Sequence, residues 1–87
     1  MIEKFGILTF DSTHHAIKAE NDLIREGIQT KTIPTPRDIT LSCGIAIRIS
    51  PDDIEKIKGL LEEGKLTYKE LHLLTIEDGK RNLDKLV

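Results

Sequence analysis

The sequence predicts an α+β fold of the ferredoxin-like type, with the element order β-α-β-β-α-β. Three observations indicate this fold. Two segments with helical spacing of apolar residues each follow a short β-rich segment, the isoleucines of residues 45–49 alternate with other residues, and proline and glycine mark the segment ends. In this topology, two helices cover one face of a four-stranded antiparallel sheet.

The first half of the chain predicts a strand, a helix and a second strand. Residues 4–10 are apolar and rich in β-formers, and residues 11–13 (Asp-Ser-Thr) offer N-caps for the helix that follows. Gly27 suits the position just after this helix. Residues 29–33 are short and β-branched and end at Pro34, which is typical of a strand.

The second half predicts a strand, a helix and a last strand. Residues 44–49 alternate as a strand with one buried face does. Residues 50–53 place serine, proline and two acids in the order of a helix start, and residues 70–76 predict the fourth strand. We therefore expect one domain over residues 1–76. The remaining residues, 77–87, are expected to form a polar tail, with a short helix covering the sheet as one option.

Composition and charge exclude several function classes. The 87 residues carry 13 basic and 15 acidic side chains, a formal net charge of −2, which creates no field that attracts nucleic acid. The predicted third strand also lacks the aromatic residues with which sheets of this topology bind RNA. No apolar stretch approaches the roughly 20 residues that cross a bilayer, and the N-terminus lacks a signal-peptide apolar region. We expect a cytoplasmic protein that binds neither nucleic acid nor membranes.

Cys43 is the only cysteine, which excludes an intramolecular disulfide and a four-cysteine metal site. It stands at a predicted loop-to-strand junction, which a right-handed crossover would bring beside the start of the first helix. A helix N-terminus and a nearby cation each lower the pKa of a thiol. We therefore predict a reactive corner in which Cys43 is the nucleophile. Its predicted binding residues are Arg37, Ser42, Gly44, Ser12, Thr13 and His14.

The residues of this corner also carry a family resemblance. Residues 9–13 (Thr-Phe-Asp-Ser-Thr), 34–37 (Pro-Thr-Pro-Arg) and 42–44 (Ser-Cys-Gly) resemble, in this order, the short bacterial domains of the Se/S carrier-like family. The resemblance spans roughly residues 5–65, with a departure at Thr40-Leu41, where small serines are frequent in the family. It implies a carrier, rather than a turnover enzyme, that holds reduced sulfur or selenium on its cysteine as a persulfide or selenosulfide. Donor and acceptor proteins would load and unload it.

Other interpretations stay open at this point. A cysteine before a strand is also common as a small buried apolar residue, so the alternative is a small-molecule-binding or protein-interaction module with a structural Cys43. His14 and His15 point about 100° apart on a helix, which disfavours a shared ligand, and we expect no metal site and no cofactor. Both faces of the strand at residues 4–10 carry apolar residues, which predicts a homodimer through the face without helices.

Overall fold

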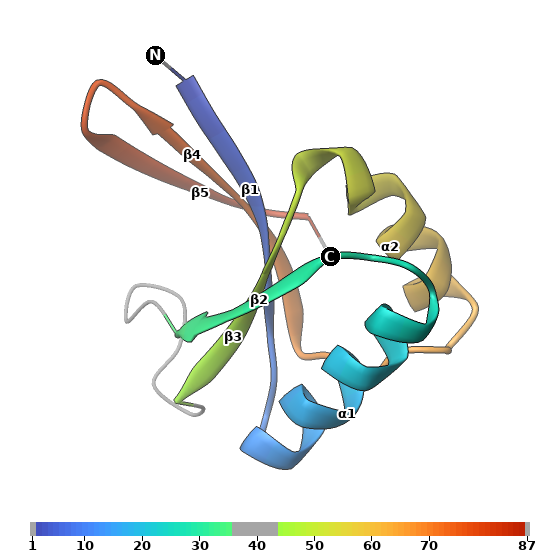
Figure 1. Ribbon diagram of the computed structural model, residues 1–87. Helices are drawn as coiled ribbons and strands as arrows, with labels where there is room; N and C mark the ends of the chain where they lie inside the picture. The colour runs from blue at the N-terminus through green and yellow to red at the C-terminus, as the bar shows by residue number, and fades with distance from the viewer. Residues whose placement is uncertain (1, 36–43, 87) are drawn as a thin grey trace.

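The computed structural model describes residues 2–35 and 44–86. The chain forms one sheet and one layer of helices (Figure 1). The elements are β1 (Ile2–Thr9), α1 (Thr13–Arg25), β2 (Thr30–Pro34), β3 (Ile45–Ile49), the 3-10 turn η1 (Pro51–Asp53), α2 (Ile54–Glu62), β4 (Glu70–Glu77) and β5 (Lys80–Lys85). All six predicted elements are present, and β5 is an additional strand.

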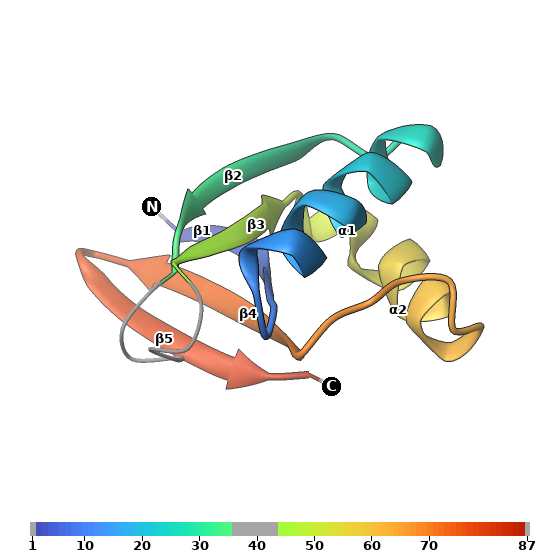
Figure 2. The same ribbon diagram turned by 90° about the horizontal axis from the view of Figure 1, so that it is seen from below.

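The five strands form one antiparallel sheet in the order β2-β3-β1-β4-β5. The central strand β1 pairs with β4 from Ile2 to Thr9 and with β3 from Gly6 to Leu8. Both helices lie on one face of the sheet, as two perpendicular views show (Figures 1 and 2). The predicted α+β fold with two helices is confirmed. The predicted four-stranded ferredoxin-like sheet is wrong, because a fifth strand pairs with β4.

Strand β5 occupies the segment for which a short helix was one option. Asp78 and Gly79 have φ values of 50° and 80°, as the two central residues of a type I′ hairpin turn do. This turn folds the chain back onto β4, so that Glu77 pairs with Lys80 and the register continues along both strands. The tail is therefore held by a backbone ladder along the edge of the sheet.

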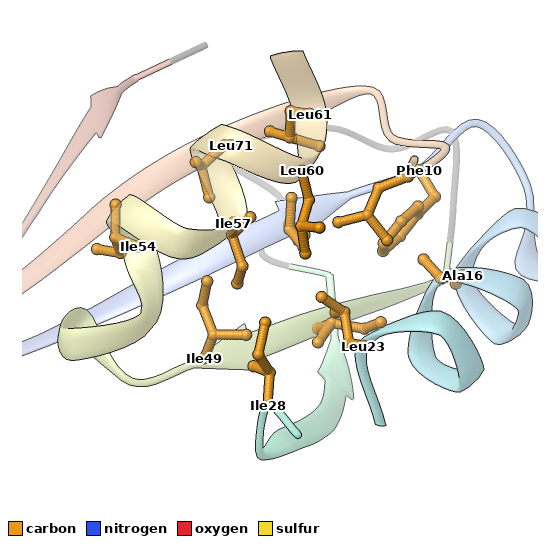
Figure 3. Packing of buried hydrophobic residues seen from close by; sticks show 14 residues of the cluster. Phe10, Ala16, Leu23, Ile28, Ile49, Ile54, Ile57, Leu60, Leu61 and Leu71 are labelled. Atoms are coloured by element: carbon orange, nitrogen blue, oxygen red, sulfur yellow. The ribbon is translucent and has the colours of Figure 1, made fainter. Parts of the chain in front are cut away.

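The main core lies between the helices and the sheet (Figure 3). Apolar side chains at helical spacing in α1 and α2 point toward alternate residues of the strands, as two amphipathic helices on a sheet require. These core residues include Ala16 and Leu23 of α1, Ile54, Ile57, Leu60 and Leu61 of α2, and Leu8, Ile49 and Leu71 of the sheet. Within residues 2–35 and 44–86, no helix combines the length and apolar character that a membrane crossing needs.

A second apolar cluster lies on the sheet face away from the helices, called the outer face below. Its buried members are Ile7, Ala46 and Leu74. Partly buried side chains of Phe5, Ile33, Ile76 and Leu83 pack against them. Strand β1 thus carries apolar residues on both faces, as its sequence predicts. The homodimer expected through this face stays a prediction.

Gly6 allows α2 and β3 to pack closely against β1. A Cβ atom at Gly6 would lie 2.5 Å from Cγ1 and 2.8 Å from Cδ1 of Ile49, and 3.2 Å from Cγ1 of Ile54. We expect Gly6→Ala to lower the free energy of unfolding by about 1–3 kcal/mol, because an overpacked core must shift to accept the methyl group. Urea unfolding followed by circular dichroism measures this change.

Gly59 provides the matched control. It lies inside α2, and a Cβ atom there would meet nothing within 4 Å. Gly59→Ala should raise the free energy of unfolding by about 0.5–1 kcal/mol, because alanine loses less backbone freedom in a helix. Equal stability of the two variants would contradict the close packing at Gly6.

Candidate functional site

The start of α1 forms one side of the predicted corner. Ser12 caps the helix: its Oγ accepts a hydrogen bond from the His15 amide at 3.3 Å, and its carbonyl oxygen accepts one from the Ala16 amide at 3.2 Å. The Thr13 and His14 amides belong to the first turn, where a helix offers them no acceptor of its own. They stand at the positive end of the helix dipole. The predicted helix start is therefore confirmed.

Asp11 does not serve as the cap, since Ser12 occupies that position. The Asp11 side chain is exposed, and its negative charge beside the helix start opposes the stabilisation of an anion there. His14 and His15 are also exposed. Among the described residues, no group of three or more His, Cys, Asp or Glu side chains is arranged to hold a metal ion.

The start of β3 forms the other side of the corner. The Thr35 amide donates to the carbonyl oxygen of Gly44 at 3.2 Å, and Pro34 pairs with Ile45. Because β1 and β3 are antiparallel, β3 begins at the end of the sheet where β1 ends and α1 begins (Figure 1). The structure thus brings Gly44 to the same end of the sheet as Ser12.

The remaining predicted residues, Arg37, Ser42 and Cys43, lie outside the described residues. Their convergence with Ser12, Thr13 and His14 stays a prediction.

The sequence interpretation did not include a polar cluster that the structure places on the outer face. Nε2 of His72 lies 3.1 Å from Oε1 of Glu70, and Nζ of Lys85 lies 3.0 Å from the other carboxylate oxygen. Thr9 donates from Oγ1 to the carbonyl oxygen of Glu70 at 3.4 Å. The cluster joins the end of β1 to β4 and β5.

The chemical state of this cluster follows from its contacts. A carboxylate only accepts hydrogen bonds, so Nε2 of His72 carries the proton in the contact with Glu70. The hydrogen bond from His72, and then the one from Lys85, hold the pKa of Glu70 below its ordinary value. Nδ1 of His72 is buried and has no hydrogen-bond partner. The cluster is thus a charge-assisted contact between strands.

Comparison with known proteins gives one match. A family described as "Putative Se/S carrier protein-like" has a model that matches residues 5–73. The chain belongs to this Se/S carrier family. The match runs from β1 into β4, includes the segment that carries Cys43, and leaves β5 outside. The family resemblance seen in the sequence is therefore confirmed. Searches of curated proteins and of solved structures gave no match.

The Glu70 contacts predict a pH-dependent stability. A carboxyl group whose pKa is lowered by folding stabilises the folded state above its unfolded pKa, and this contribution disappears as the pH falls through the lowered, folded value. Glu70→Gln should lower the free energy of unfolding at pH 7 by about 0.5–1 kcal/mol, as expected for a partly exposed ion pair. The difference from the wild type should shrink as the pH falls below about 4.5 and vanish once the pH lies below the lowered pKa of Glu70 in the folded state.

Urea unfolding between pH 7 and pH 2.5 measures this dependence. Glu62→Gln, at an exposed position of α2, is the control and should leave the curve unchanged. A Glu70→Gln effect of the same size at every pH would show that the charge of Glu70 does not contribute.

Proposed function

We propose that this Se/S carrier family member holds reduced sulfur or selenium on Cys43, as a persulfide or selenosulfide, and passes it to an acceptor thiol. Membership of the family over residues 5–73 is the observation that carries this proposal. Cys43 is the only thiol of the chain, so a thiol-bound cargo has a single point of attachment. The proposal expects a reducing compartment such as the cytoplasm, in which a free thiol persists.

The described geometry supports an anion at this end of the sheet. The start of α1 supplies a positive helix terminus, with the Thr13 and His14 amides free of helical acceptors. The Ser12 hydroxyl accepts from His15, so its own hydrogen remains available as a donor. We infer that these groups and Arg37 stabilise the Cys43 thiolate against the opposing charge of Asp11.

The proposed transfer is balanced without an external oxidant. The Cys43 thiolate attacks the terminal sulfur of a donor persulfide, which forms the Cys43 persulfide and releases the donor thiolate. An acceptor thiolate then attacks the terminal sulfur of the Cys43 persulfide, and the Cys43 thiolate leaves. The same two displacements move selenium when the donor carries it as a selenosulfide. Donor and acceptor each need a reactive thiol, which makes thiol proteins the expected partners.

A loading experiment tests whether Cys43 accepts the cargo. The reduced protein is incubated with polysulfide, or with selenite and a thiol, and its intact mass is measured. We expect an added mass of one sulfur or one selenium atom that dithiothreitol removes. Cys43→Ser should abolish the addition. A Cys43 thiol that stays unmodified until the protein is unfolded would contradict the proposal and favour the structural role of this cysteine.

The pH dependence of Cys43 alkylation tests the contribution of Arg37. We expect the alkylation rate to reach half its maximum at a pH below about 8.5, the value for a free thiol, because cations and helix N-termini favour the thiolate. Arg37→Gln should move this midpoint upward. Arg25→Gln is the matched control, since Arg25 lies in the last turn of α1, at its opposite end. An identical midpoint in both variants would exclude Arg37 from the site.

A further inference from the structure

A hollow of about 270 Å³ lies beside the C-terminal end of β3. From this end the chain continues through η1 into α2 (Figure 1). Side chains of Lys31 and Arg48 line it, together with Phe5, Ser50 and Pro51. Gly44, which directly precedes β3, lies at the opposite end of the same strand. The hollow is therefore separate from the end of the sheet at which we propose the carrier site, and its chemistry needs its own explanation.

Two cations stand directly opposite each other beside this hollow. Lys31 of β2 pairs with Arg48 of β3, so both side chains lie on the outer face. Like charges at directly opposite positions of an antiparallel pair destabilise a sheet. In the part of the chain that the structure describes, no carboxylate forms an ion pair with either side chain. This holds also for Glu26, Asp52 and Asp53, the described acids nearest in sequence to the two cations.

At the other end of the same row of residues, a cation does have an acid beside it. Strand pairing places Lys31, Arg48, Ile7, His72 and Lys85 in one row across all five strands. Glu70 contacts both His72 and Lys85. Lys31 and Arg48 have no such partner among the described residues. The protein thus leaves a concentrated positive charge at one end of the row.

Arg48 is also held in position. Its guanidinium carbon lies 4.6 Å from the centroid of the Phe5 ring, which fixes the planar group through a cation–π contact while its edges remain available as donors. The Ser50 hydroxyl accepts a hydrogen bond from the Asp52 amide at 3.3 Å and retains its own hydrogen as a further donor. Phe5 and Pro51 add apolar wall to the hollow.

We propose that this hollow binds a small organic oxyanion, a phosphate ester or a carboxylate, through Lys31 and Arg48. Arg48 supplies the planar donor group that carboxylates and phosphates match, and Lys31 supplies a second, mobile positive charge. The volume lies at the lower limit of small-molecule sites, which favours a compact ligand whose apolar part contacts Phe5 and Pro51. Binding also removes the repulsion between the two cations.

Titrations of the ¹⁵N-labelled protein at 0.15 M NaCl test this proposal by nuclear magnetic resonance. The probes are inorganic phosphate, phenyl phosphate, benzoate and the neutral benzyl alcohol. We expect saturable shifts of the amides at Lys31, Arg48 and Ser50 with phenyl phosphate or benzoate, and weaker shifts with inorganic phosphate. The tighter of the two aromatic anions identifies the ligand class. Binding of benzyl alcohol with equal affinity would overturn the role of the charges.

Variants of the two cations sharpen the test. Lys31→Met and Arg48→Gln should each weaken binding of the tighter anion about tenfold or more, as the loss of a hydrogen bond to a charged group does. Lys18→Met, at an exposed position of α1, is the matched control and should leave affinity unchanged. Circular dichroism establishes that each variant is folded.

Thermal unfolding supplies a second measurement that a structural role would not reproduce. Without a ligand, Lys31→Met should leave the melting temperature unchanged or raise it, because the substitution removes a like-charge contact from an exposed edge-strand position. The anion should raise the melting temperature of the wild type more than that of Lys31→Met. Equal affinities in wild type and both cation variants, or shifts confined to His72 and Lys85, would overturn the proposal.

Discussion

Burial of β1 on both faces is the constraint on which the rest of the structure depends. Ile7 and Leu8 are neighbours in sequence, point to opposite faces and are both fully buried. Leu8 is buried in the core under the helices, and Ile7 is buried in the outer-face cluster. The strand is therefore stable only in the middle of a sheet. Gly6 then sets how closely Ile49 and Ile54 approach the strand. The antiparallel pairing of β1 with β3 brings the start of α1 and the start of β3 to one end of the sheet, where the carrier site is proposed.

The sequence was sufficient to predict the elements that bury side chains, but not the one held mainly by backbone hydrogen bonds. The helix after Ser50 was predictable because its apolar spacing and start signals are local. The structure begins this segment with the 3-10 turn η1, whose cap is Ser50, and α2 follows from Ile54 without a side-chain cap. Strand β5 contains one apolar residue, Leu83, so the alternation that marks a strand is almost absent. The informative signal was Asp78-Gly79, a two-residue hairpin turn directly after a predicted strand. This turn was recognised, but a strand after it was not expected.

For the candidate site, too, local features were predictable and contacts between strands were not. Ser12 as a helix cap and Gly44 at the start of a strand follow from local residue preferences, and the topology brings them to one end of the sheet. Glu70 and His72 are two residues apart on a predicted strand, so their shared face could be inferred. Their contact with Lys85 could not, since it exists only because β5 pairs with β4. The Lys31–Arg48 pair likewise needs the register of β2 on β3, which short strands do not specify by sequence alone.

The proposed sulfur or selenium transfer and the proposed oxyanion binding are assigned to opposite ends of strand β3. Arg48 is four residues from Gly44, about 13 Å along an extended strand, so an anion beside Arg48 lies at the other end of β3 from Gly44. The like-charge pair opposes the pairing of β2 with β3, because an oppositely charged or apolar pair at the same positions would stabilise it more. Glu70 shows that this outer face does supply an acid beside a cation, because it contacts Lys85 as well as His72. We therefore infer that an external anion explains why Lys31 lies opposite Arg48, and the proposed sulfur transfer does not by itself require an anion at this end of the strand.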